Sequence, residues 1–402
     1  MNADNLNLKS FLLRGARVVL PDGVAEDAAL LIEGELIARV IPASEGQLPN
    51  ADEVLDLNGH TLFPGFIDIH NHGAAGVDTL EANADDLHRV ARMLAKYGVT
   101  AWLPTLVPAI VEDYVRAAGA VTQLMNEQDA RPPAAYTLGL HYEGPFVNTA
   151  QCGALRTIHF RTYANASDLD ALTKVEHENA AHMITVAPEI EGGIDLVREL
   201  AARGWVVSIG HTRADTGVLD SAYAAGARHM THFMNAMLPL HHRAPGPIGW
   251  GLMNDAVTCD VIADGVHCDP LILQLILRCK TAGRIALISD SIAPTGLGDG
   301  EYKIWGEKIA VVKGRTQNER GSIAGSVITM LDGVRMMRSL GVAEHEVACM
   351  AATVPARVLN LDHSYGSIEE GKRADLVALD NENRVRLTII GGRVAFDNLS
   401  GA

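Results

Sequence analysis

The sequence predicts an α/β fold, a (β/α)8 TIM-like barrel with a small β-sandwich domain formed by both chain ends. Three observations favour this fold. About eight short, apolar, β-rich segments recur through the middle of the chain, and amphipathic segments rich in Ala and Leu lie between most of them. Both ends carry alternating apolar runs separated by turn residues. Buried parallel strands that alternate with helices define the α/β class, and eight such units suggest a closed barrel.

The predicted barrel elements follow one another along the middle of the chain. The expected strands are Gly65–Ile69, Thr100–Leu106, Thr137–His141, Met183–Ala187, Val206–Ile209, Arg228–Thr231, Val257–Ile262 and Ile285–Ser289. Each is a short apolar run of the kind that a parallel sheet buries on both faces. The amphipathic stretches between them include Asp85–Tyr97, Val111–Gln128, Ile194–Arg203 and Asp215–Ala225, which predict covering helices.

The two ends of the chain carry a different pattern. Residues 8–62 contain the alternating runs "FLLRGARVVLPDG" and "AALLIEGELIARVI", and the tail contains "GSIEEGKRADLVALD" and "VRLTIIGGRVAFD". Alternating runs with turn residues between them are typical of antiparallel strands. We therefore expect residues 1–62 and 361–402 to form one small β-sandwich domain beside a barrel domain of residues 63–360.

Composition limits the classes of function. Of the 402 residues, 48% are hydrophobic and 20% are charged, which is enough apolar material for a large core. The net charge of −16 disfavours nucleic-acid binding, which relies on a basic surface. A small anionic substrate stays open, because a local cluster such as His241, His242 and Arg243 can dominate one pocket.

Three features bear on the location of the protein. No apolar run reaches the roughly 20 residues of a membrane span. The N-terminus lacks the basic start, apolar stretch and cleavage site of a secretory signal. The five cysteines form no C-x-x-C pair, which favours free thiols in a reducing compartment. We expect a cytoplasmic protein with neither a membrane nor a nucleic-acid partner.

Metal-capable side chains follow the predicted barrel strands. Two histidines follow the first strand in "PGFIDIHNHG", and a glutamate follows the third in "GLHYEGPF". Further histidines and an aspartate follow the fifth, sixth and eighth strands in "VVSIGHT", "HMTHFMNAM" and "ALISDS". The carboxyl ends of barrel strands meet at one face, where active sites are built. We therefore expect six side chains to converge there: His70, His72, Glu143, His211, His232 and Asp290.

The residue types indicate hydrolytic chemistry. In an extended chain, His70 and His72 project to the same side and can share one cation. Imidazole and carboxylate ligands together suit Zn or Fe(II). Such an ion lowers the pKa of bound water to roughly 7 and polarises a carbonyl oxygen. Asp290 beside that water can take its proton and pass it to a leaving group, which is the equipment for hydrolysing an amide or an ester.

Each of these residues also has an ordinary structural interpretation. A lone H-x-H pair is weak evidence for a metal, Glu143 alone can be a buried salt-bridge partner, and Asp290 can cap a turn. His211 or His232 in isolation would more often be a hydrogen-bonded core histidine than a ligand. Their joint placement at strand ends favours the metal site over these separate roles.

Several longer motifs resemble a known family. The chain carries "PGFIDIHNHG", "GLHYEGPF", "SIGHT", "THFMNAMLPLHHRAPG", "IADGVH", "SDSIAPTG" and "GSIAGS". These are similar to motifs of the N-acetylglucosamine-6-phosphate deacetylases of the amidohydrolase superfamily, and the tail "ATVPARVLNLD…GSIEEGKRADLVALD" resembles the shared end of that superfamily. The resemblance covers essentially the whole chain and implies a metal-dependent barrel with a β-sandwich built from both ends.

The resemblance also implies roles for individual residues. Glu143, His211 and His232 match the main metal ligands, His70 and His72 match the H-x-H of members that hold a second ion, and Asp290 matches the general base and acid. One or two ions of Zn or Fe per subunit are therefore expected. The residues implied at the substrate are Arg243 with its neighbour His242 at the sugar phosphate, His267 near the sugar, and backbone N–H groups around Asn235 and Ala236. A homodimer is implied as well, with Arg243 or His267 reaching across its interface.

This sequence departs from the family pattern in three places. Leu155 stands where the family has a sugar-contacting histidine, with Arg156 next to it. Ser291 follows Asp290 where alanine is usual, and Ala244 replaces an acidic residue in "RAPG". The metal ligands match, so hydrolysis is expected. The change at Leu155 bears on the sugar, because an unpaired substrate hydroxyl costs roughly 1–3 kcal/mol.

The sequence therefore predicts a metal-dependent deacetylase of an N-acetylhexosamine 6-phosphate, first of all N-acetylglucosamine 6-phosphate. A deacylase of another N-acyl substrate stays open as an alternative. That substrate would be an unphosphorylated or galacto-configured amino sugar, or an N-acyl amino acid. A barrel protein that has lost its chemistry is disfavoured by the intact set of six residues.

Overall fold

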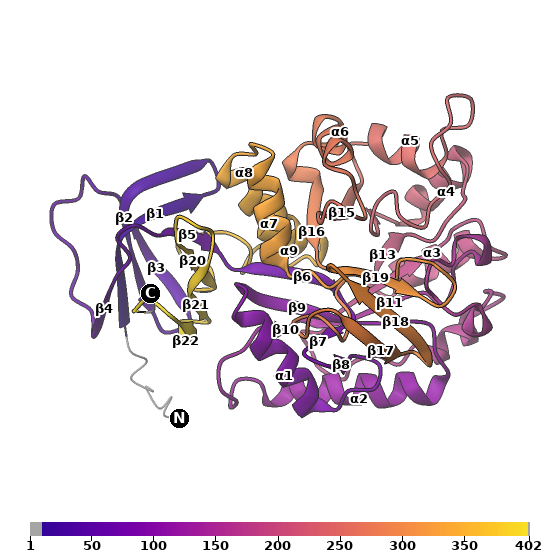
Figure 1. The fold of residues 1–402 in the computed structure, drawn as a ribbon, viewed down its shortest axis with the longest axis horizontal. Helices are drawn as coiled ribbons and strands as arrows, with labels where there is room; N and C mark the ends of the chain where they lie inside the picture. The colour runs from indigo at the N-terminus through magenta and orange to yellow at the C-terminus, as the bar shows by residue number, and fades with distance from the viewer. Residues whose placement is uncertain (1–9, 401–402) are drawn as a thin grey trace.

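The computed structural model describes residues 10–400, and it contains a barrel with a smaller sheet at its side (Figure 1). The first nine residues of the predicted 1–62 segment and the last two of 361–402 lie outside the described residues. The largest apolar core belongs to the barrel, and the terminal sheet encloses a separate core of its own. Among residues 10–400, no helix combines the length and the apolar character needed to cross a bilayer.

Eight parallel strands form the barrel, which confirms the predicted fold class. In order around the sheet they are β6 (Phe66–Asn71), β9 (Val99–Leu106), β11 (Gly139–Glu143), β12 (Ala181–Val186), β13 (Val206–Ile209), β14 (His229–Met230), β15 (Thr258–Ile262) and β16 (Ile285–Ile288), with the short β10 (Tyr136–Thr137) also beside β9. The first and last strands meet just beyond their carboxyl ends. There, the backbone N–H of Asp290 donates to the His70 carbonyl at 2.9 Å, and that of His72 donates to the Ser291 carbonyl at 2.8 Å.

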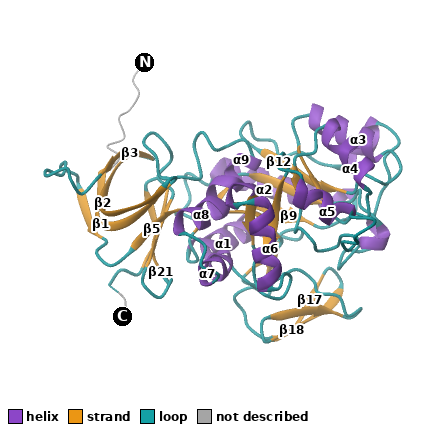
Figure 2. Ribbon diagram, turned by 90° about the horizontal axis from the view of Figure 1, so that it is seen from above, coloured by secondary structure: helices purple, strands orange, loops and turns teal. Residues whose placement is uncertain are grey.

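Helices surround this barrel (Figure 2). They are α1 (Ala84–Ala95), α2 (Val111–Glu127), α3 (Gly193–Ala202), α4 (Thr216–Ala225), α5 (Gly246–Met253), α6 (Pro270–Lys280), α7 (Met330–Ser339), α8 (Glu344–Ala348) and α9 (Val354–Val358). The first helix shows why the sequence forms them. Asn83 and Asp86 make a reciprocal capping box at its start, and Leu87, Val90 and Leu94 bury one stripe against the strands.

Both ends of the chain contribute to one eight-stranded sheet. Its strands are β1 (Ser10–Leu20), β2 (Gly23–Glu33), β3 (Leu36–Ile41), β4 (Glu53–Asp56), β5 (Thr61–Pro64), β20 (Leu376–Leu379), β21 (Val385–Ile390) and β22 (Arg393–Asp397). Most neighbours are antiparallel, but β1 pairs in parallel with β4 and β5. Since β5 lies in this sheet, its span crosses the predicted domain boundary between residues 62 and 63, and that boundary stays a prediction.

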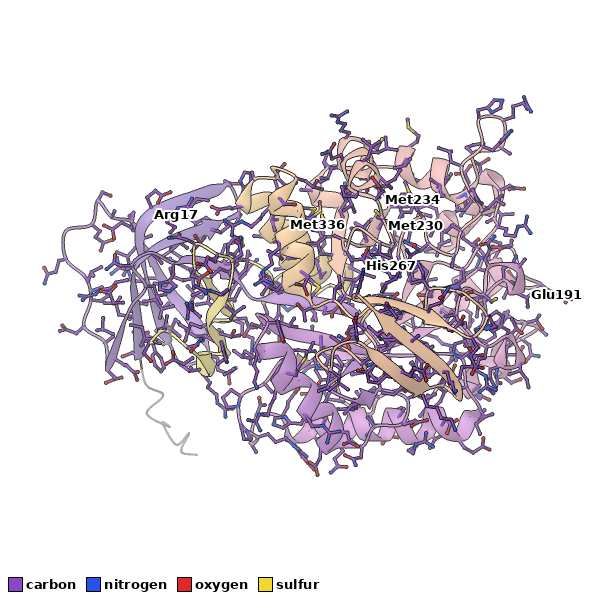
Figure 3. All side chains as sticks on the ribbon, in the orientation of Figure 1. Arg17, Glu191, Met230, Met234, His267 and Met336 are labelled. Atoms are coloured by element: carbon purple, nitrogen blue, oxygen red, sulfur yellow. The ribbon has the colours of Figure 1, made fainter. Side chains whose placement is uncertain are left out.

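The terminal sheet is fastened to the barrel side by polar contacts. The guanidinium of Arg17 (labelled in Figure 3) donates to both carboxylate oxygens of Glu344, at 3.3 and 3.0 Å. Glu344 begins α8 and also accepts from Arg338 of α7 at 2.6 Å. The N-terminal strand β1 is thereby held against α7 and α8 on the side of the barrel.

A third, smaller sheet follows β16 and was not predicted. It comprises β17 (Gly300–Ile304), β18 (Glu307–Val312) and β19 (Arg315–Asn318), all antiparallel. Figure 2 shows β17 and β18 standing apart from the helices of the barrel. A short hairpin, β7 (Gly73–Ala74) with β8 (Val77–Asp78), follows β6.

At Gly139 the backbones of β11 and β12 approach so closely that there is no room for a side chain. The φ of Gly139 is +150°, and a Cβ there would lie 1.9 Å from the Ala181 carbonyl oxygen. We expect Gly139→Ala to destabilise the protein by about 1–3 kcal/mol, as overpacking does. As a control, Gly119 lies inside α2 with nothing within 4 Å of its would-be Cβ, so Gly119→Ala should stabilise by about 0.5–1 kcal/mol. The urea midpoint measures both, and a midpoint of Gly139→Ala at or above that of the unsubstituted chain would contradict the analysis.

Candidate metal centre and active site

The six predicted site residues converge at the carboxyl ends of the barrel strands. Glu143 is the last residue of β11, and His70 and His72 lie at and just after the end of β6. His211, His232 and Asp290 each stand two residues beyond the end of their strand, and each has a positive φ, of 48°, 32° and 49°. Non-glycine residues seldom adopt this conformation, and it is concentrated at functional sites. The same backbone turn therefore aims all three side chains into the barrel mouth.

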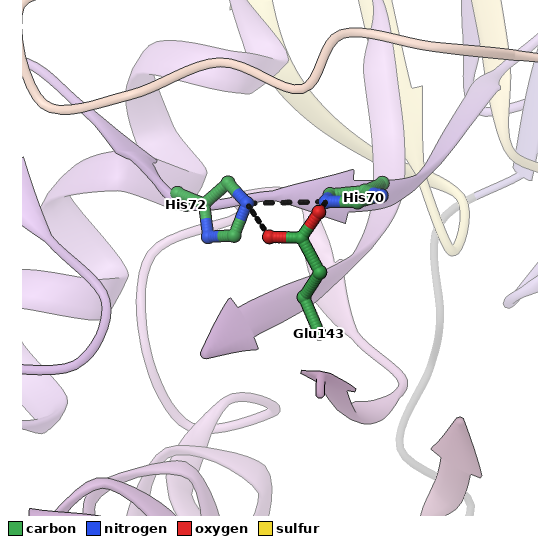
Figure 4. A group of neighbouring side chains, drawn as sticks. All are labelled: His70, His72 and Glu143. Atoms are coloured by element: carbon green, nitrogen blue, oxygen red, sulfur yellow. Dashed lines mark hydrogen bonds and ion pairs between the residues drawn. The ribbon is translucent and has the colours of Figure 1, made fainter. Parts of the chain in front are cut away.

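One group of potential ligands comes from β6 and β11 (Figure 4). The Nε2 atoms of His70 and His72 are 3.1 Å apart. Glu143 faces both, with Oε1 at 3.7 Å from His70 Nε2 and Oε2 at 3.3 Å from His72 Nε2. All three side chains are buried.

The second group shares the same glutamate. Glu143 Oε1 lies 2.9 Å from Nε2 of His211 and 2.9 Å from Nε2 of His232, and these two nitrogens are 3.1 Å apart. Four-coordinate zinc with bonds of roughly 2.0–2.1 Å places its ligand atoms about 3.3 Å from one another. Separations of 2.9–3.7 Å in the two groups are therefore compatible with a cation at the centre of each.

The ring contacts of His72 and His211 make Nε2 the acceptor atom of each neutral ring. Nδ1 of His72 lies 3.1 Å from the Thr105 carbonyl, and Nδ1 of His211 lies 2.8 Å from the Gln151 carbonyl. A carbonyl oxygen only accepts, so in each neutral ring Nδ1 carries the proton and Nε2 presents a lone pair to Glu143. A lone pair that faces a carboxylate oxygen at 2.9–3.3 Å needs a positive charge between the two atoms, which either a proton on the imidazole or a bound cation supplies.

The electrostatics of the cluster favour positive charge at His72 and His232, whereas burial lowers the pKa of His70 well below its usual range. Burial opposes a charged His72, but contacts with Asp290 and Glu143 outweigh it and raise the pKa of His72 to about 10. His232 is likewise buried, and Glu143 raises its pKa to about 9. Burial would raise the pKa of Glu143, yet hydrogen bonds with His211 and its neighbours hold that pKa well below its usual range. A divalent cation supplies the same positive charge and leaves the imidazoles neutral for coordination.

Asp290 lies beside this cluster. Its Oδ1 is 3.5 Å from His70 Nε2 and 3.4 Å from His72 Nε2. Its backbone is held on both sides, because its N–H donates to the His70 carbonyl and its own carbonyl accepts from Ser326 N–H at 2.7 Å. The carboxylate is thus fixed within reach of anything bound at the imidazoles.

A buried polar network supports the loop that carries Asp290. The Asp68 carboxylate accepts from the Ser289 hydroxyl at 2.6 Å and from the Asn71 amide at 3.0 Å. The same amide donates to the Ser291 hydroxyl at 2.8 Å, and that hydroxyl donates to the Gly73 carbonyl at 3.0 Å. Burial raises the pKa of Asp68 to about 6. Ser291, which departs from the family's usual alanine, therefore has its hydroxyl satisfied within this network.

A cleft of about 320 Å³ opens over the cluster. Its lining includes Glu143, His72, His211, His232 and Asp290, and four of the predicted substrate residues as well, namely Leu155, Asn235, Ala236 and His267. His267 (Figure 3) has its Nδ1 2.7 Å from the Asp264 carboxylate, which leaves Nε2 for a ligand. These four residues share one cavity with the proposed metal ligands, and their roles toward a substrate stay predictions.

Three predicted substrate residues lie outside the cleft lining. Arg243 and His242 are exposed on the loop before α5, where an Arg243 Nη1 to His242 Nε2 distance of 2.9 Å joins them. Arg156 is also exposed, and its guanidinium donates to the Trp305 carbonyl at 3.2 Å. Their roles toward a substrate stay predictions.

Sequence reasoning missed several residues of the cleft. Gly153, Ala154, Ser322, Ile323 and Trp305 all line it, and the last belongs to the unpredicted hairpin of β17 and β18. The stretch "EYKIWGEKIAVV" does alternate on both sides of a two-residue turn, which is a hairpin signal. Nothing in that pattern indicates that its tip reaches the barrel mouth.

Comparison with known proteins supports a common chemistry. The amidohydrolase family profile matches residues 61–395. The chain is 33% identical to an N-acetylglucosamine-6-phosphate deacetylase of Bacillus subtilis, over 92% of this chain and 96% of that protein. It is 34% identical to an N-acetylgalactosamine-6-phosphate deacetylase of Escherichia coli O157:H7, over 96% and 99% respectively.

A solved structure shows the same fold at full length. It is an aspartate-to-alanine mutant of the Mycobacterium smegmatis N-acetyl-D-glucosamine-6-phosphate deacetylase in complex with N-acetyl-D-glucosamine-6-phosphate. The TM-score is 0.86 at 29% identity, and the match covers 96% of this chain and 99% of that one. The match of the family profile, the identity to these relatives and the shared fold place the chain in the amidohydrolase family, among the N-acetylhexosamine-6-phosphate deacetylases.

Proposed function

We propose that this protein removes the acetyl group from an N-acetylhexosamine 6-phosphate, N-acetylglucosamine 6-phosphate first of all, to give acetate and the amino sugar phosphate. The observation that carries the proposal is the shared carboxylate of Glu143 among four imidazole nitrogens at the floor of a cleft. The relatives with this activity support the substrate class, since they match the chain over nearly its full length.

A divalent cation, Zn or Fe(II), fits the nitrogen and carboxylate donors. Glu143, His211 and His232 would hold one ion, and His70, His72 and Glu143 would hold a second. When bound there, such a cation polarises the amide carbonyl and lowers the pKa of water to roughly 7.

Asp290 would move the proton. Its carboxylate takes one proton from the attacking water as the oxygen bonds to the carbonyl carbon, and then gives that proton to the amide nitrogen as the C–N bond breaks. The proton lost by water is thus the proton gained by the departing amine, and Asp290 ends in its starting state. The backbone hydrogen bonds on both sides of Asp290 favour this role, because they hold its carboxylate beside the imidazoles of His70 and His72.

The polar lining of the cleft supports a sugar on the nitrogen side of the amide. Asn235, Ala236 and His267 offer amide, backbone and imidazole groups to hydroxyls and to the phosphate. Arg243 would grip the phosphate by a charge-assisted hydrogen bond. Because Arg243 lies outside the cleft of its own chain, we propose that it serves the cleft of a partner subunit in a homodimer.

The surface around Arg243 supports that dimer. Leu240, Met253 and Leu271 are exposed by 52, 80 and 71% on the loop before α5, on α5 and on α6. The side chain of Leu240 reaches Gly249 of α5, so Leu240 lies against the helix that carries Met253. Exposed apolar surface of this kind is typical of an interface.

All five cysteines are free, which supports the proposed cytoplasmic location.

The galacto-configured substrate is a second candidate. The relative named for N-acetylgalactosamine 6-phosphate is as similar to this chain as those named for the gluco epimer, at 34% against 33% identity. Leu155 supports a difference at the sugar, because it places a buried apolar side chain where the family pattern has a histidine.

The metal proposal predicts how ligand variants change metal content. Glu143 belongs to both groups, so Glu143→Ala should lose both ions, whereas His72→Asn should lose only the ion shared with His70. Elemental analysis of protein purified with added Zn measures the stoichiometry, and the exposed His363 provides a control as His363→Asn. Equal metal content in Glu143→Ala and the unsubstituted chain would contradict the site.

The proton-transfer role predicts a specific loss in Asp290→Asn. The variant should keep its metal, because the imidazoles and Glu143 remain, and its kcat should fall by about 10²–10⁴-fold. Asp362→Asn changes an aspartate outside the cleft and should leave kcat unaltered. Turnover of Asp290→Asn close to that of the unsubstituted chain would remove Asp290 from the mechanism.

The substrate proposal is tested by acetate release from four sugars, the gluco and galacto epimers with and without the 6-phosphate. A phosphorylated sugar should be preferred, and Arg243→Ala should lower its kcat/KM by about 10- to 100-fold with little effect on the plain sugars. Hybrid dimers of one Arg243→Ala and one Asp290→Asn subunit should recover about half of the dimer activity, because one cleft then has both residues. No recovery would place Arg243 at its own cleft, and equal rates on plain and phosphorylated sugars would exclude the phosphate grip.

A further inference from the structure

Trp305 occupies an unfavourable place in a tight turn. Ile304 pairs with Glu307, so Trp305 and Gly306 form a two-residue connection between β17 and β18. Their φ angles are +53° and +77°. Turns of this kind favour Asn, Asp or Gly at both positions, and a bulky residue with positive φ is strained. The geometry of the turn therefore does not explain a tryptophan at this position. The contacts that its side chain makes explain it.

The side chain points to the metal cluster. The Trp305 ring lies 5.5 Å from the His72 ring, centroid to centroid, at an interplanar angle of 78°. It packs against the small apolar cluster that contains Leu155, and both residues line the cleft. The indole is thus at the His72 end of the cluster.

Two arginine contacts hold this hairpin against the segment that carries Leu155. Arg156 donates to the Trp305 carbonyl at 3.2 Å, and Arg320 donates to the Ala154 carbonyl at 2.7 Å. Arg320 follows β19, and its Nη2 also lies 3.4 Å from Oε2 of Glu307 in β18. Trp305 at the hairpin tip, Ala154 and Leu155 therefore form one wall of the cleft.

The cleft is polar at its opposite end. His72 meets Oε2 of Glu143, whereas His211 and His232 meet Oε1. Asn235 follows His232, its N–H donating to the His232 carbonyl at 2.8 Å, and its amide reaches Cys268 beside His267. An amide substrate has a matching polarity, because its nitrogen carries a hydrophilic sugar and its carbonyl carbon carries an apolar acyl group.

We propose that Trp305 forms the acyl wall of the active site and limits the substrate to a short acyl group. The inference rests on the proposed deacetylase function and adds the specificity of the acyl side to it. An acetyl methyl fits beside the indole, whereas a longer chain collides with a ring that is itself packed on His72 and on the Leu155 cluster. Trp305 is on this account a specificity-determining residue, and it moves no proton.

The test compares acyl chains of different length. Trp305→Asn removes the indole and restores a residue that suits the turn, so the hairpin is preserved. The substrates are N-acetyl-, N-propionyl- and N-butyryl-glucosamine 6-phosphate. One methylene in an apolar pocket changes kcat/KM by about 10–200-fold, so we expect the propionyl-to-acetyl ratio to rise at least about tenfold in Trp305→Asn. Lys303→Ala, exposed on β17, serves as the matched control and should leave the ratio unchanged.

The outcomes separate this inference from the proposed function. A propionyl-to-acetyl ratio that is the same in Trp305→Asn and in the unsubstituted chain, at equal metal content, would overturn the acyl wall and leave the deacetylase proposal standing. A parallel fall for all three acyl chains would likewise assign Trp305 a purely structural role. Absence of acetate release by the unsubstituted chain from any hexosamine phosphate would overturn the deacetylase proposal, and with it the acyl wall.

Discussion

The structure depends on one electrostatic constraint, which is that the buried carboxylate of Glu143 is surrounded by four imidazole nitrogens and needs positive charge among them. His72 and His211 use their Nδ1 protons on backbone carbonyls, so the atoms that they turn toward Glu143 carry lone pairs. Buried lone pairs and a buried carboxylate at these separations repel one another unless a positive charge lies between them. The arrangement is that of a coordination site for a divalent cation.

The barrel supplies the rigidity that this constraint requires. His211, His232 and Asp290 adopt the same uncommon backbone conformation at the same distance beyond their strands. Such strain persists only where the surroundings over-determine it. Here the surroundings are the closure of β16 on β6 and the buried network of Asp68, Asn71 and the serines that flank Asp290. A loop without this support would hold the carboxylate less precisely over the imidazoles.

The sequence was sufficient to predict the barrel and the metal-capable cluster, because both follow from short-range patterns. Eight apolar runs indicate parallel strands, and a ligand after a strand lies at the barrel mouth whatever the loops do. The hairpin of β17 to β19 escaped prediction for the opposite reason. The position of Trp305 is set by contacts across more than two hundred residues, with His72, and across about one hundred and fifty, with Leu155 and Arg156. No local pattern reports such contacts, and the same holds for Ser291 within the Asp68 network.

The most direct measurement of the central claim is anomalous scattering at the zinc edge from crystals of the protein grown with zinc. The account predicts a peak bonded to Glu143, His211 and His232 at about 2.0–2.2 Å from each ligand atom. A second, weaker peak is predicted between His70, His72 and Glu143. Zinc bound only at other sites, with no anomalous density within bonding distance of Glu143, would contradict it.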